Sequence, residues 1–107
     1  MKYQPFLYAD KANEKFMSHN KTEPLFMYIA FQSVHRPMQA PWQFTKIYSD
    51  RPEMSQPQRV FAGMVSALDA AVGQVVQGLK DSGLWDNTLI FFSNDNGRDG
   101  SGEERGG

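Results

Sequence analysis

The residues best suited to chemistry lie in two short polar blocks, each of which follows an apolar run. One block contains His35, and the other runs from Ser93 to Gly97 and reads S-N-D-N-G. Asp95 carries a carboxylate and Asn96 a carboxamide, and both supply the hard oxygen donors that hard cations prefer. The second block is therefore a candidate site for a hard cation or an anionic substrate.

These blocks can meet only if the elements before them bring them to one edge. Leu25–Phe31 and Thr88–Phe92 are short, continuous apolar runs, which predict strands buried on both faces. Between them, three- and four-residue apolar steps predict an amphipathic helix over Gln58–Ser82, with Pro57 in its first turn and Gly83 at its C-terminal cap. A right-handed crossover would make the two strands parallel. Their carboxyl ends would then share one rim, where ligands bind in open α/β sheets.

The other segments complete this organisation. Ala9–His19 is predicted to be a short surface helix, and residues 38–58, with their prolines and aromatic residues, an ordered irregular crossing. The glycines of the long helix predict close helix–sheet packing; they are Gly63, Gly73 and Gly78. Residues 98–107 are predicted to form a flexible, Gly-rich tail. Because two strands and two helices cannot close a sheet, we expect an α/β fold that is part of a larger mixed sheet covered by helices.

Length and composition exclude several classes of protein. At 107 residues the chain has room for one small domain at most, or for part of a larger one. A net charge of −1 and the lack of a basic patch argue against nucleic acid. No apolar run approaches the roughly 18 residues of a membrane span, and the N-terminus does not look like a signal peptide. Without cysteine, the chain has no disulfide, no thiolate zinc site and no cysteine nucleophile.

Three blocks of this sequence resemble the middle of a type I sulfatase. They read P-L-F-M-Y-I-A-F-Q-S-V-H-R-P, then F-A-G-M-V-S-A-L-D-A-A-V-G, then S-G-L-W-D-N-T-L-I-F-F-S-N-D-N-G. Their order and spacing are most similar to the arylsulfatase B (N-acetylgalactosamine 4-sulfatase) subgroup with its I and J relatives. The resemblance extends from about Tyr8 to Gly97. It implies that residues 1–107 are part of the N-terminal catalytic domain of a sulfatase, with an alkaline-phosphatase-like α/β fold.

The resemblance also implies a reaction, the hydrolysis of sulfate esters at a calcium site. By motif, Asp95 and Asn96 would be two calcium ligands, and His35 would contact the sulfate or its leaving oxygen. The family's nucleophile is a formylglycine made from a cysteine, so we expect this cysteine-free chain to be inactive alone. The implied substrates are sulfated carbohydrates such as glycosaminoglycans, or aryl sulfates. The implied location is lysosomal or secreted.

Several of these patterns also have plainer interpretations. Asp95-Asn96-Gly97 by itself favours a turn. We expect His19 to be a packed or surface histidine and Asp69 a solvated or helix-pairing carboxylate, and we assign neither a role. Ser55–Arg59 fits S-x-P-x-R, the serine form of the formylglycine motif, but it follows the histidine block instead of preceding it, so we interpret it as coincidence. Asn20-Lys21-Thr22 is an N-x-T sequon, which matters only in a secreted protein.

Two other functions stay open at this point. A truncated, non-catalytic sulfatase-like module that binds a partner or a sulfated glycan would be consistent with the missing nucleophile. A phosphatase or phosphodiesterase of the same superfamily fits less well. Such enzymes use two metals with several histidines, whereas His35 alone lies near the predicted rim.

Overall fold

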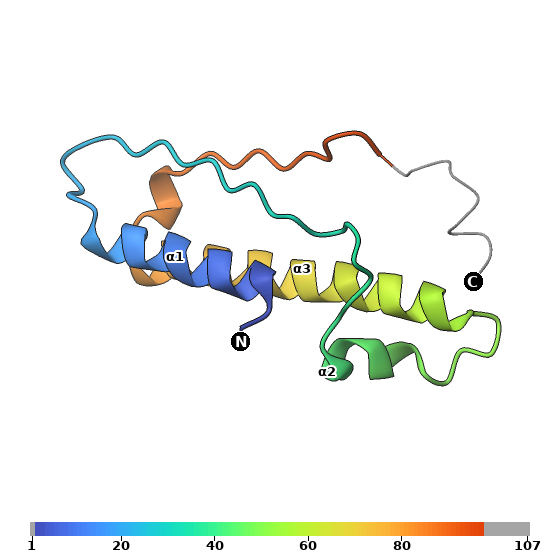
Figure 1. The fold of residues 1–107 in the computed structure, drawn as a ribbon. Helices are drawn as coiled ribbons and strands as arrows, with labels where there is room; N and C mark the ends of the chain where they lie inside the picture. The colour runs from blue at the N-terminus through green and yellow to red at the C-terminus, as the bar shows by residue number, and fades with distance from the viewer. Residues whose placement is uncertain (1, 98–107) are drawn as a thin grey trace.

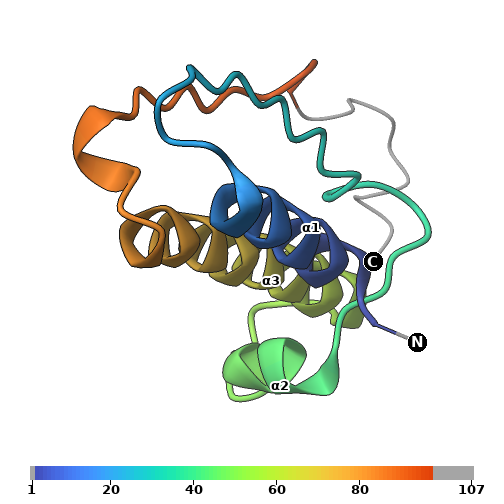
Figure 2. The same cartoon turned by 90° about the vertical axis from the view of Figure 1, so that its left-hand side faces the viewer.

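The computed structural model describes residues 2–97 and arranges them as two long helices beneath two extended segments (Figures 1 and 2). In chain order the elements are α1 (Gln4–Ser18), α2 (Trp42–Thr45), the 3₁₀ helix η1 (Lys46–Tyr48), α3 (Gln56–Asp81) and the 3₁₀ helix η2 (Trp85–Asn87). α1 and α3 lie side by side, and the extended segments pass over the same side of this pair.

The long helix predicted from apolar periodicity is confirmed as α3. A capping box begins it: the Ser55 hydroxyl accepts from the Gln58 N–H at 3.3 Å, and the Gln58 side chain accepts from the Ser55 N–H at 2.7 Å. Pro57 lies in the first turn, as predicted. Gly83 follows the helix with a φ of +77°, the left-handed conformation that ends many helices and suits glycine.

Small residues let α1 and α2 approach α3 closely. Gly78 lies against Asn13 of α1, and Gly63 lies against Thr45 of α2. These two glycines do allow close packing, but their neighbours are helices, so the predicted helix–sheet packing is not observed within the described residues. At Gly73, no atom of residues 2–97 lies within 4 Å of the position that a Cβ would take. The buried apolar core consists of Ala9, Ala12, Phe16, Met64, Ala67, Ala71 and Leu79.

The predicted sheet is not confirmed, although the two apolar runs are extended. Residues 2–97 contain no β-strand, and within them no backbone–backbone hydrogen bond joins residues 24–32 to residues 88–92. The two segments do run in the same direction (Figure 1). A β-strand is defined by a ladder of backbone hydrogen bonds to a neighbouring strand, and neither segment has such a ladder in the described chain.

One face of the first extended segment is covered and its other face is open, whereas the second segment, residues 88–92, is exposed throughout. Alternate residues of an extended chain point to opposite faces. Met27 and Ile29 pack against the core of α1 and α3, whereas Phe26 and Tyr28 are 91% and 83% exposed. In the second segment Phe91 is 89% exposed. Burial on both faces, which the continuous apolar runs predicted, is therefore not observed.

The N-terminal helix begins earlier than predicted. α1 starts at Gln4 rather than Ala9 and ends at Ser18. Its N-cap residue, Tyr3, makes no capping hydrogen bond with its side chain, and Pro5 in the first turn is the sequence signal for this start. The crossing before α3 is ordered and largely irregular, as predicted, with α2 and η1 as its short helices. The predicted tail at 98–107 lies outside the described residues.

By length and composition alone, α3 is long and apolar enough to cross a membrane. The sequence prediction of no membrane span considered only continuous apolar runs, and so did not identify this helix. Core helices of soluble proteins pass the same test. Along its length α3 packs against α1 and α2, and its small residues lie at these contacts.

Candidate functional site

Asp95 and Asn96 lie on an exposed turn at the end of the second extended segment. Neither side chain forms a hydrogen bond with another described residue. Gly97 has a φ of +73°, so the chain turns directly after the pair in a conformation that suits glycine. The turn and the metal-ligand interpretations of this motif are therefore compatible, because the turn presents one carboxylate and one carboxamide to solvent.

His35 lies in the exposed loop after the first extended segment. Its Nδ1 is 3.1 Å from the Arg36 carbonyl oxygen; since a carbonyl can only accept, Nδ1 is the donor. Nε2 makes no hydrogen bond with the described residues and is an acceptor in the neutral ring and a second donor in the cation. Cis peptide bonds occur on either side, at Ser33–Val34 and Arg36–Pro37.

The two extended segments carry these motifs toward the same end of the molecule (Figure 1). Within residues 2–97, no hydrogen bond joins His35 to Asp95 or Asn96, and no group of three or more His, Cys, Asp or Glu side chains could hold a metal ion. The structure thus places the predicted site residues toward one end without assembling them into a closed site.

The donor set fits calcium in kind and falls short in number. Calcium takes about six to eight oxygen ligands from carboxylates, carbonyls and water. Asp95 supplies one or two such oxygens, and Asn96 supplies one. A calcium ion bound here would need further donors from other polypeptide or from water.

Ser55 has a structural role that accounts for its hydroxyl. The S-x-P-x-R pattern at Ser55–Arg59 coincides with the first turn of α3, where the Ser55 hydroxyl caps the helix. Arg59 is also occupied, because its guanidinium donates to the Arg51 carbonyl at 2.8 Å. The same stretch contains S-x-x-Q, a capping-box pattern, so the sequence held the signal for this role.

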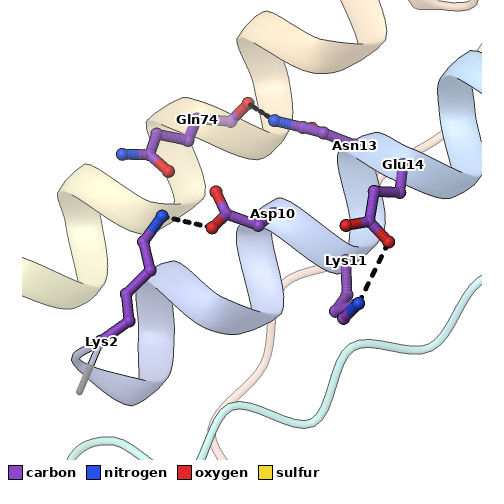
Figure 3. Close-up of polar contacts among 6 residues, drawn as sticks. All are labelled: Lys2, Asp10, Lys11, Asn13, Glu14 and Gln74. Carbon is purple, nitrogen blue, oxygen red and sulfur yellow. Dashed lines mark hydrogen bonds and ion pairs between the residues drawn. The ribbon is translucent and has the colours of Figure 1, made fainter.

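A second polar cluster lies on α1 (Figure 3). Lys2 pairs with Asp10, and Lys11 pairs with Glu14 at 3.2 Å; the side chain of Asp10 is 40% exposed and the other three are more than half exposed. Exposed pairs of this kind contribute about 0–1 kcal/mol each. Since each carboxylate already faces a lysine, this cluster is a surface feature and offers no second cation site.

The two residues that were given no role have positions that agree with this expectation. His19 Nε2 lies 2.8 Å from the Glu23 carbonyl oxygen and helps to close the turn after α1. Asp69 lies exposed on α3.

Comparisons with known proteins point to one family. The family model described as Sulfatase matches residues 4–106. Arylsulfatase J from Mus musculus is 37% identical over 95 residues, which cover 89% of this chain and 16% of the relative. Human N-acetylgalactosamine-6-sulfatase is 28% identical over 92 residues, which cover 85% of this chain and 16% of the relative. An arylsulfatase from Klebsiella aerogenes is 26% identical over 140 aligned positions, which cover 89% of this chain and 30% of the relative. No solved structure gives a significant match.

The extent of these matches supports the resemblance drawn from the sequence blocks. The matched range includes both the His35 block and the Asp95–Asn96 motif. The chain spans only 16% of the length of mouse arylsulfatase J and 30% of the bacterial arylsulfatase. The family model nevertheless covers nearly all of the 107 residues, and the chain therefore belongs to the sulfatase family.

Proposed function

We propose that this chain supplies part of the catalytic site of a sulfatase that hydrolyses sulfate esters. The observation that supports this most directly is the placement of two polar motifs of a sulfatase-family chain. Each motif follows an extended segment, and the two segments run in the same direction toward one end of the molecule (Figure 1). One motif contributes His35, and the other contributes Asp95 and Asn96.

Asp95 and Asn96 are the proposed calcium ligands of this chain. Both side chains are exposed, and neither is held by a hydrogen bond to another residue among 2–97, so none of the described residues competes for their oxygens. A bound calcium ion would supply positive charge beside the sulfate oxygens. The part played by the chain is to present two oxygen donors from a turn that Gly97 makes possible.

His35 is the proposed contact to the sulfate or to its leaving oxygen. The Arg36 carbonyl holds Nδ1 at 3.1 Å and so helps to orient the ring. In the cationic ring, Nε2 donates a charge-assisted hydrogen bond to a sulfate oxygen. A proton on Nε2 could also be transferred to the leaving oxygen, which would make His35 a general acid.

The nucleophile has to come from polypeptide other than these 107 residues. The family's formylglycine arises from a cysteine, and the sequence contains none. Ser55, the candidate in the S-x-P-x-R pattern, is engaged as the N-cap of α3. We therefore propose that the isolated chain does not hydrolyse sulfate esters, because covalent catalysis needs an activated nucleophile.

The proposed substrates are sulfated carbohydrates, including glycosaminoglycans, or aryl sulfates. The names of the relatives support this class, since one is an N-acetylgalactosamine-6-sulfatase and others are arylsulfatases. The proposed location is the lysosome or the extracellular space.

The native polypeptide provides the test. An antibody against residues 44–58 would capture it from its source for measurement of its intact mass and of its turnover of an aryl sulfate ester. We expect a mass several times 12.2 kDa and turnover that a calcium chelator abolishes. A native species of 12.2 kDa without turnover would contradict the proposal. Binding of a sulfated glycan by that species would then identify a non-catalytic module.

A further inference from the structure

We propose that Asn20 is an N-glycosylation site, an inference that rests on the proposed lysosomal or secreted location. Asn20-Lys21-Thr22 has the N-x-T pattern that oligosaccharide transfer to asparagine requires. No other asparagine in the sequence is followed at the second position by serine or threonine. The chain therefore has a single candidate acceptor.

The candidate acceptor lies at the tip of an exposed turn. α1 ends at Ser18, and the turn is closed by the Glu23 N–H, which donates to the Asn20 carbonyl at 3.0 Å. Residues 20–23 are all exposed. An exposed turn between a helix and an extended segment is accessible to a transferase and can carry a bulky group without loss of packing.

The side chain of Asn20 is held in one orientation. Its Oδ1 accepts from the Thr22 hydroxyl at 2.8 Å and from the Thr22 N–H at 3.1 Å. Its Nδ2, the atom that would carry the glycan, forms no hydrogen bond with the described residues. Lys21 points back toward the protein, since a Cβ placed on Gly83 would lie 3.2 Å from its Nζ. The middle residue of the sequon therefore does not obstruct Nδ2.

These contacts suit the chemistry of the transfer. Nδ2 forms a bond to the anomeric carbon of a lipid-linked diphospho-oligosaccharide, and the bond from that carbon to the diphosphate oxygen breaks. The lipid diphosphate leaves with the electron pair, and one Nδ2 proton passes to a base of the transferase. As that proton leaves, negative charge develops on Oδ1, where the two Thr22 donors stabilise it.

A glycan on Asn20 would lie far from the candidate catalytic site. The turn is at the opposite end of the molecule from the end toward which both extended segments run (Figure 1). Glycosylation is therefore compatible with substrate access to His35 and Asp95.

The test is to translate the 107-residue chain behind a cleavable signal sequence in the presence of endoplasmic-reticulum microsomes. We expect one slower-migrating band that an asparagine-specific N-glycosidase collapses. Asn20→Gln and Thr22→Ala should abolish the band, and Thr22→Ser should keep it. A wild-type chain without the band, or a band that survives Asn20→Gln, would overturn the proposal.

An import control makes a negative result decisive. Leu89→Thr in the Asn20→Gln background completes an N-x-T pattern at Asn87 on exposed chain. Modification of that variant beside an unmodified wild-type chain would show that import occurs and that Asn20 is not an acceptor. Because no sulfatase activity is read, failure of this proposal and failure of the proposed hydrolysis are separate results.

Discussion

At the residue scale, the proposed role of Asp95 depends on its charge as well as its oxygens. Asp95→Asn keeps the size and an oxygen donor but removes the negative charge that attracts a divalent cation. In the native sulfatase polypeptide we expect kcat/KM for an aryl sulfate to fall by about 100-fold or more, with partial recovery at high calcium. Asp69→Asn is the matched control, because Asp69 is exposed on α3 with no proposed role. Equal activity of the two variants would refute the ligand assignment.

The proposed role of His35 can be tested against the other histidine of the chain, His19. His35→Ala in the native polypeptide should lower kcat by about 10²- to 10⁴-fold, because a donor to the sulfate or its leaving oxygen is lost. The other histidine provides the control: His19 contacts the Glu23 carbonyl in a turn at the far end of α1, so His19→Ala should leave kcat unchanged. The measurement is steady-state turnover of an aryl sulfate. A small effect confined to KM would contradict the assignment.

The local geometry of Ser55 agrees with the interpretation of its S-x-P-x-R pattern as a coincidence. S-x-P-x-R and S-x-x-Q overlap in the same five residues, so one serine fits both a modification motif and a helix cap. The hydrogen bonds to Gln58 show that it caps α3. By contrast, Asp95, Asn96 and His35 were named from motif and position. The distance between His35 and the Asp95–Asn96 pair depends on how other segments of the chain pack, which the motifs themselves do not determine.

At the element scale, two identical substitutions in α3 separate helix propensity from packing. Gly73→Ala should raise the free energy of unfolding by up to about 1 kcal/mol, because nothing in the described part of the chain lies within 4 Å of the new Cβ. At Gly78 a Cβ would lie 1.9 Å from Asn13 Oδ1. Gly78→Ala should therefore lower the free energy of unfolding by about 1–3 kcal/mol. Denaturant unfolding of the purified native protein measures both changes.

A third variant tests the reason for this difference. Asn13 donates to the Gln74 carbonyl at 3.3 Å, and its buried Oδ1 has no hydrogen-bond partner among the described residues. Asn13→Ala together with Gly78→Ala removes the clash and the unsatisfied atom, so the double variant should be more stable than Gly78→Ala alone. If Gly78→Ala is as stable as Gly73→Ala, α1 and α3 are not in close contact at this position.

The predictability of each element follows from how local its determinants are. α3 could be predicted because its periodicity, capping residues and C-terminal glycine are all written within the segment itself. α1 was predicted to start late because residues 1–8 show no clear apolar periodicity and Asp10 suggested a later start, whereas the helix begins at Gln4. Local sequence patterns could not establish the sheet. Strands at Leu25–Phe31 and Thr88–Phe92 require backbone hydrogen-bond partners outside each segment. What those runs did predict correctly is extended chain.

At the scale of the whole molecule, the described chain is elongated and only partly buried. Its radius of gyration is 16.3 Å, with extents of 52 × 27 × 25 Å, whereas a compact domain of this length has a radius of about 13 Å. Met27 and Ile29 cover one side of the helix pair, but the opposite face of the extended segments is apolar and open. Such a face is expected to be covered in a stable protein.

The open face leads to a prediction for the isolated 107-residue chain. We define it by four residues that are at least 81% exposed, which are Phe26, Tyr28, Leu89 and Phe91. The chain should bind a hydrophobic dye and self-associate as its concentration rises, because contiguous apolar surface and unpaired extended backbone favour association. Phe26→Ser with Phe91→Ser should reduce both effects, while Met17→Ser, which alters a separate exposed side chain on α1, should not. Dye fluorescence and sedimentation velocity are the measurements. A chain that stays monomeric and binds no dye would mean that this face is closed in solution, by pairing of the two segments or by their collapse onto the helices.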